Sequence, residues 1–159
     1  MMKHRKPFNL VSTTAVAALV VGAAFTGATT ALADEMPPQG SMALSAILSN
    51  IEPDAGTIIE AEFDDGLWEL TAYKGDRLTV YHVDPTTGDV AKQRVDDDDE
   101  ELPPDDAMKL SALAEKLEAS EPGTITSIEF DEGVFEVEMQ DGDEETEFDV
   151  DPRTGERVE

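Results

Sequence analysis

The sequence contains no cysteine, and this absence limits both its stability and its chemistry. Without thiols the chain can form neither disulfides nor a cysteine-based zinc site. Of its 2 histidines, only His82 lies beyond the first ten residues. A Gly-x-Ser-x-Gly nucleophile elbow and a glycine-rich phosphate loop are also missing. The sequence offers no catalytic, metal or cofactor constellation, so we expect a protein that is not an enzyme and holds no cofactor.

Basic residues are scarce as well, with 11 Lys and Arg against 37 Asp and Glu and a formal net charge of −26. Proteins that bind nucleic acid need basic surfaces to meet the phosphate backbone, so nucleic-acid partners are excluded. Anionic membrane surfaces are disfavoured for the same reason. A solvated acidic surface, attraction of cations and a basic protein partner all stay open.

The first 33 residues have the pattern of a secretory signal peptide. An apolar run from Leu10 to about Thr29 follows a short basic start, and Ala31-Leu32-Ala33 offers a small-x-small cleavage site between Ala33 and Asp34. A retained membrane anchor is the alternative. Cleavage would remove 3 basic residues (Lys3, Arg5 and Lys6) and change the formal charge from −26 to −29. We expect export to the periplasm first and to the extracellular space second, with no membrane association after cleavage, because no second apolar run follows.

The remaining chain is an internal repeat with a period of 67 residues. Residues 56–90 and 123–157 align without a gap and share 16 identities in 35 positions. Each copy ends in the same turn, Asp-Pro-x-Thr-Gly, at Asp84–Gly88 and at Asp151–Gly155. Proline presets a turn angle and Asp can accept hydrogen bonds from amides two residues on, so we interpret this turn as structural.

Each repeat predicts one helix followed by three strands. Apolar residues at helical spacing precede the strands, at Leu44, Ile47, Leu48 and Ile51 and again at Leu110, Leu113, Ala114 and Leu117. Three alternating runs joined by tight turns then predict an antiparallel meander. We therefore expect an α+β fold of two tandem repeats, each with one helix packed on a three-stranded sheet. The predicted segments are a disordered leader (34–40), the first repeat (41–91), an acidic linker containing proline (92–104) and the second repeat (105–159).

The repeat resembles the PepSY domain. The residues that carry the resemblance are Gly56-Thr57-Ile58, Phe63–Leu70 and Tyr81–Asp89, with their counterparts Gly123-Thr124-Ile125, Phe130–Val137 and Phe148–Glu156. The resemblance implies a small α+β module of exported bacterial proteins, without catalytic residues. The family includes propeptides of thermolysin-like metallopeptidases, so an exported protein or peptidase is the implied partner. This chain carries no protease domain and would be a free-standing tandem module.

Two candidate binding features remain. Tyr73, Leu78, Val80 and His82 are predicted to share the sheet face opposite the helix, where an apolar patch calls for a partner, either the second repeat or another protein. Open edge strands could pair the repeats into one sheet or accept an extended peptide. The alternative function is a cation- or salt-responsive protein, with the acidic runs Asp96–Glu101 and Asp141–Glu145 as calcium candidates, although neither has the spaced pattern of a calcium loop.

Overall fold

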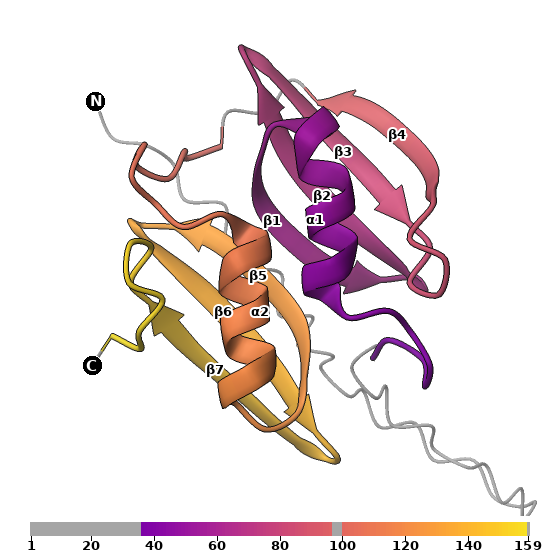
Figure 1. The fold of residues 1–159 in the computed structure, drawn as a ribbon, viewed down its shortest axis with the longest axis vertical. Helices are drawn as coiled ribbons and strands as arrows, with labels where there is room; N and C mark the ends of the chain where they lie inside the picture. Colours follow the sequence, from indigo (N-terminus) through magenta and orange to yellow (C-terminus); the bar gives the residue numbers. More distant parts are fainter. Residues whose placement is uncertain (1–35, 97–99, 159) are drawn as a thin grey trace, which may run out of the picture. The chain divides into compact units, whose positions relative to one another are not determined.

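The computed structural model describes residues 36–96 and 100–158, and within them a single antiparallel sheet carries two helices (Figure 1). The elements in chain order are α1 (Leu44–Ala55), β1 (Thr57–Asp64), β2 (Leu67–Lys74), β3 (Arg77–Val83), β4 (Val90–Asp96), α2 (Leu110–Ser120), β5 (Thr124–Asp131), β6 (Val134–Asp141) and β7 (Glu144–Val150). The strand order across the sheet is β4-β3-β2-β1-β5-β6-β7. The predicted α+β class is confirmed, and the two repeats share one sheet.

The repeat architecture differs from the prediction in the first copy. Residues 90–96 form the strand β4, which pairs antiparallel with β3, whereas we expected a linker from Lys92 onward. The linker prediction was wrong over Lys92–Asp96, because these residues pair with the backbone of β3 although their own side chains stay largely exposed. In the segment predicted as the leader, the described residues before Ser41 include a turn in which Ser41 N donates to Pro38 O at 3.0 Å. The predicted signal peptide and its cleavage point between Ala33 and Asp34 lie outside the described residues.

Tight turns explain the meanders. The two residues between β1 and β2 are Asp65 and Gly66, with φ angles of 48° and 80°, and Glu132 and Gly133 take the same place between β5 and β6. Two consecutive positive φ angles define the type I′ hairpin, whose twist matches that of the flanking strands. The tight turns that the sequence predicts between these strands are therefore present in both repeats.

The Asp-Pro-x-Thr-Gly turn anchors the start of each helix. Asp84 Oδ1 accepts hydrogen bonds from the amides of Thr86 and Thr87 at 2.8 and 2.9 Å, which lowers the pKa of Asp84. The carbonyl of Pro85 accepts the amide of Met42, just before α1, at 2.8 Å, and Pro152 accepts Met108 in the same way at 2.7 Å. Because both copies make these contacts, the structural interpretation of the turn is supported.

The two repeats meet around an approximate twofold axis. At the centre of the sheet Ala61 pairs with Ile128, and these two residues are equivalent positions of the repeat. Glu60 pairs with Glu129 and Glu62 with Ser127. The twofold axis maps the first of these pairs onto the second, because Glu60 is equivalent to Ser127 and Glu62 to Glu129. The pairing of β1 with β5 thus joins two equivalent strand edges that would otherwise be open.

The helices cap each other across the repeats. Glu52, near the end of α1, accepts hydrogen bonds from Ser111 N at 2.9 Å and Ser111 Oγ at 2.8 Å at the start of α2. Glu118 in α2 accepts from Ser45 N at 3.1 Å and Ser45 Oγ at 2.5 Å at the start of α1. These carboxylates satisfy amides that lack intrahelical partners and lie at the positive ends of the helix dipoles.

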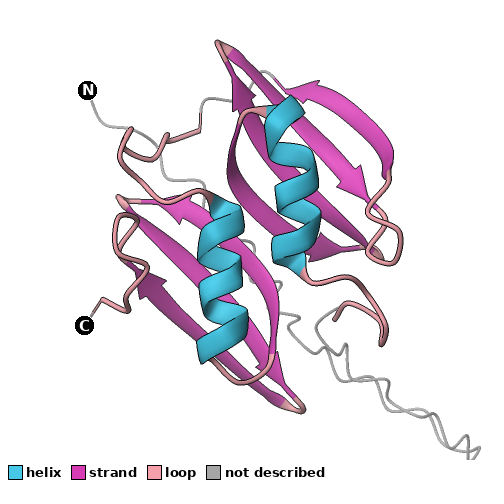
Figure 2. Cartoon of the chain, viewed as in Figure 1, coloured by secondary structure: helices cyan, strands magenta, loops and turns pink. Residues whose placement is uncertain are grey.

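Both helices lie on one face of the sheet, and the core fills the space between the two layers (Figure 2). All eight predicted stripe residues are buried. Opposite them, Phe63 packs edge-on against Trp68 with ring centroids 5.4 Å apart, and Phe130 repeats this contact with Phe135 at 5.3 Å. Burial of these apolar side chains on both repeats gives one continuous core without disulfides.

Candidate binding surface of the sheet

The predicted binding residues lie on the sheet face away from the helices, called the outer face below, but they do not form an exposed apolar patch. In the register, Val80 lies opposite Thr71 and His82 opposite Glu69, whereas Tyr81 lies opposite the buried core residue Leu70. Leu78 and Val80 are only 4% and 3% exposed, so the expectation of exposure was wrong for both.

Two structural features account for the difference. The strand β4 lies beside β3, with Arg94 opposite Val80 and Asp96 opposite Leu78. Glu100 lies beside β2, where its N donates to Tyr73 Oη at 3.2 Å. Neither feature has a signature in the apolar pattern on which the prediction depended.

His82 is held by a carboxylate on the neighbouring strand. Its Nδ1 lies 3.0 Å from Glu69 Oε1, and its side chain is 14% exposed. Among the described residues Nε2 has no hydrogen-bond partner. His82 therefore serves as a cross-strand partner of Glu69.

The dominant feature of the outer face is negative charge. Carboxylates occupy outward positions on β2, β1, β5, β6 and β7, and we call this set the acidic face: Glu60, Glu62, Glu69, Glu129, Glu136, Glu138, Glu145, Glu147 and Asp149. Several acids lie directly opposite one another on adjacent strands, at Glu62/Glu69, Glu60/Glu129, Glu129/Glu136, Glu136/Asp149 and Glu138/Glu147. Like charges in directly opposed positions destabilise a sheet, so this face is arranged at the expense of stability.

The electrostatics of the acidic face are strongest where the repeats meet. Burial, followed by the charges of Glu60 and Glu136, raises the pKa of Glu129 to about 7. Burial and the neighbouring acids Glu60, Asp64 and Glu69 also raise the pKa of Glu62, and burial followed by nearby acids raises that of Glu136. A cation bound to this face would relieve repulsion that the folded chain otherwise retains.

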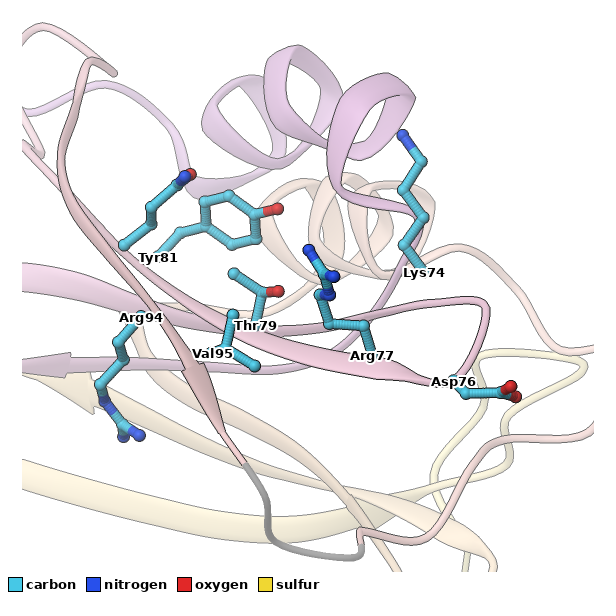
Figure 3. A pocket seen from close by; sticks show the side chains of 8 residues that line it. Lys74, Asp76, Arg77, Thr79, Tyr81, Arg94 and Val95 are labelled. Carbon is cyan, nitrogen blue, oxygen red and sulfur yellow. The ribbon is translucent and has the colours of Figure 1, made fainter.

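The edge of the sheet that ends in β4 is basic. Lys74 and Arg77 flank the β2–β3 turn, and β4 adds Lys92 and Arg94. A pocket of about 650 Å³ opens beside these strands, where Arg77 and Tyr81 point toward the helix side and Arg94 points to the other side (Figure 3). Half of the 8 basic residues that follow the predicted signal peptide are therefore gathered at one edge. Lys92 and Arg94 are two residues apart, a spacing that places both side chains on the same face of a strand. This spacing is the sequence signal that could have revealed β4.

The other edge of the sheet is β7. Within the described part of the chain, β7 pairs with β6 on one side and, on the other, is joined only by Arg157 and Val158 at its end. Val150 bridges Arg157, and Val158 N donates to Asp149 O at 2.9 Å. Arg157 stacks on the Phe148 ring, 3.6 Å from its centroid, and pairs with Glu121 at 2.6 Å. Sequence reasoning predicted open edges in general but did not single out this one.

No group of three or more metal-ligating side chains occurs in the described ranges, and the calcium candidate Asp96–Glu101 lies partly outside them. None of the described helices combines the length and apolar character that a membrane span requires.

The fold and surface define a class of protein, namely a tandem α+β repeat with a fused sheet and an acidic outer face. A sequence profile of the peptidase propeptide and YPEB domain (PepSY) family matches residues 12–94 and 97–159. The chain belongs to this family, and the predicted resemblance is confirmed. The membership is consistent with export.

The search of curated proteins found no match. Among solved structures, the chain is similar to a candidate lipoprotein from Clostridium difficile 630, with 16% identity over 72% of this chain and 88% of that one, and a TM-score of 0.43.

Proposed function

We propose that the chain is an exported, non-catalytic PepSY-domain module that binds a cationic protein or peptide through the outer face of its sheet, with an exported peptidase as the candidate partner. The observation that carries this proposal is the set of directly opposed acids on the acidic face. Their mutual repulsion is a cost to folding, and a cationic partner would turn it into binding energy and into faster association.

Family membership supports the peptidase as partner class, because the family is named for peptidase propeptides. Export, inferred from the predicted signal peptide, would place the module where exported peptidases act. The absence of a catalytic constellation in the sequence supports a binding role over an enzymatic one.

A matched pair of charge-reversal variants tests the role of the acidic face. Glu138→Lys changes an acid of this face, and Asp76→Lys makes the same charge change in the exposed β2–β3 turn. Binding to a cationic probe protein, cytochrome c, is measured by calorimetry at low ionic strength. A larger loss of affinity for Glu138→Lys supports the face as the binding surface, whereas equal losses would show that only net charge matters.

The peptidase class is tested separately. Hydrolysis of a peptide substrate by a thermolysin-like metallopeptidase is measured with increasing amounts of the chain. Saturable inhibition that Glu138→Lys weakens and Asp76→Lys retains supports the proposal, and unchanged hydrolysis removes this peptidase class from it.

The alternative function, a cation-responsive protein, is favoured by one observation, the raised pKa of Glu129 at the centre of the acidic face. Calorimetry with calcium distinguishes the two functions. A saturable micromolar site would favour the alternative, and weak heats that 0.15 M salt abolishes would indicate diffuse screening only.

A further inference from the structure

The third strands of the two repeats are equivalent, but their outer edges are paired differently. β3 and β7 are the third strands of their repeats, 67 residues apart, and each is followed by the Asp-Pro-x-Thr-Gly turn. After the turn, Val90 pairs with Val83, and Arg157 pairs with Val150 at the equivalent place. In the first repeat the chain then continues along β3 as β4. In the second, among the described residues, no strand lies along the outer edge of β7 from Glu144 to Phe148.

The strand β4 shows which chemistry fits such an edge. Its outward residues Lys92 and Arg94 lie opposite His82 and Val80 of β3. Within Glu144–Phe148 of β7 the outward positions are Glu147, the counterpart of Val80, and Glu145, the counterpart of Leu78, so alternate basic residues would meet acids there instead of apolar side chains. Opposite charges in directly opposed positions stabilise a strand pair. The edge of β7 therefore suits a strand of the β4 type better than β3 itself does.

We propose that the edge of β7 between Glu144 and Phe148 accepts an extended segment of a partner protein as an added antiparallel strand, with Lys or Arg at alternate positions facing the acidic face. This inference rests on the proposed function and specifies its partner. Backbone hydrogen bonds supply affinity in such strand addition, and the alternating side chains supply specificity. A second copy of the chain offering its own β7 would bring acids against acids.

The test uses a synthetic peptide with the sequence of residues 90–96, Val-Ala-Lys-Gln-Arg-Val-Asp, titrated into the ¹⁵N-labelled chain at low ionic strength. We expect saturable chemical-shift changes centred on Glu144–Phe148. One control peptide, Val-Ala-Lys-Arg-Gln-Val-Asp, keeps the composition but makes the basic residues adjacent, so that only one can face the acids. Another, Val-Ala-Lys-Pro-Arg-Val-Asp, keeps both basic residues but removes a strand N–H.

On the protein side, Glu147→Lys reverses an exposed charge on β7, and Asp76→Lys makes the same change in the β2–β3 turn. We expect Glu147→Lys to raise the Kd by about tenfold, because an attraction becomes a repulsion, and Asp76→Lys to have a much smaller effect. Equal affinity of the three peptides, or equal effects of the two variants, would overturn strand addition at β7. So would a concentration-dependent dimer that the peptide dissociates, because it would assign the edge to a second copy.

The outcome also separates this inference from the proposed function. If the peptide fails to bind while cytochrome c still binds in a manner that depends on Glu138, strand addition is wrong and the acidic face stands. If neither binds through the acidic face, both proposals fail.

Discussion

Replacing Glu52 with alanine tests whether the two repeats stabilise each other through their helix ends. Glu52 is 8% exposed and accepts two hydrogen bonds from Ser111, at 2.9 Å from the amide and 2.8 Å from the hydroxyl. The variant leaves a buried amide at the start of α2 without its acceptor, together with the buried hydroxyl. The equivalent carboxylate, Glu118, makes the same pair of contacts to Ser45 in an exposed position, so Glu118→Ala is a matched control.

The magnitude follows from burial. A hydrogen bond to a charged group contributes about 1.5–3 kcal/mol, and part of this is offset because the carboxylate itself no longer has to be desolvated. We therefore expect Glu52→Ala to lower the free energy of unfolding by about 2–3 kcal/mol. Glu118→Ala should cost about 1 kcal/mol, as expected of an exposed helix cap.

Urea denaturation followed by circular dichroism measures both values, with an unchanged m-value as the sign that the unfolded surface is the same. A double-mutant cycle with Ser111→Ala should give a coupling energy of at least about 1 kcal/mol. If Glu52→Ala costs no more than Glu118→Ala, or if the coupling vanishes, the contact between Glu52 and Ser111 does not stabilise the fold.

Three further substitutions give independent tests. Gly56→Ala should lower the free energy of unfolding, measured by urea denaturation, by more than about 2 kcal/mol. The φ of Gly56 is +96°, and a Cβ there would lie 2.3 Å from Tyr73 O. The control Gly75→Ala places its Cβ in open space and should cost about 1 kcal/mol. Trp68→Phe should lower the free energy of unfolding by less than about 1.5 kcal/mol. The second repeat has Phe135 at this position, and the indole N–H of Trp68 has no partner among the described residues. A larger loss in the same assay would contradict this expectation. Glu129 keeps its proton up to about pH 7 in the folded chain but loses it near 4.5 when unfolded, so the folded state binds more protons and stability falls as pH rises through this window. Glu129→Gln should flatten that fall and raise stability at pH 7.5 by about 1–2 kcal/mol after solvent screening, and an unchanged pH profile would show that Glu129 is not protonated at neutral pH.

Local sequence signals predicted the parts of the fold that local physics determines. The helical stripes, the alternation of the first three strands of each repeat and the tight turns between these strands all depend on neighbouring residues, and each is found where it was predicted. The 67-residue period predicted the equivalence of the two halves, which appears in the pairing of Ala61 with Ile128.

The features that sequence reasoning missed depend on residues far apart in the chain. The strand β4 has exposed side chains and is held by the edge of β3, so no buried alternation marks it. The helix caps come from Glu118 and Glu52, 73 and 59 residues away from the amides they bind, so no local signal marks them.

The candidate binding surface was predicted only in part. The outward position of the acids in the second repeat follows from strand alternation alone. The burial of Leu78 and Val80 does not, because a residue's face depends on strand period whereas its exposure depends on what lies over that face.

Amide hydrogen exchange of the chain with and without the peptide of residues 90–96 shows whether β7 accepts an added strand. We expect slower exchange in Glu144–Phe148, the edge along which no described strand lies, and little change in the central strands β1 and β5, whose edges are already paired. Slower exchange at β4 or at the centre of the sheet, with β7 unchanged, would contradict the assignment of β7 as the site of strand addition.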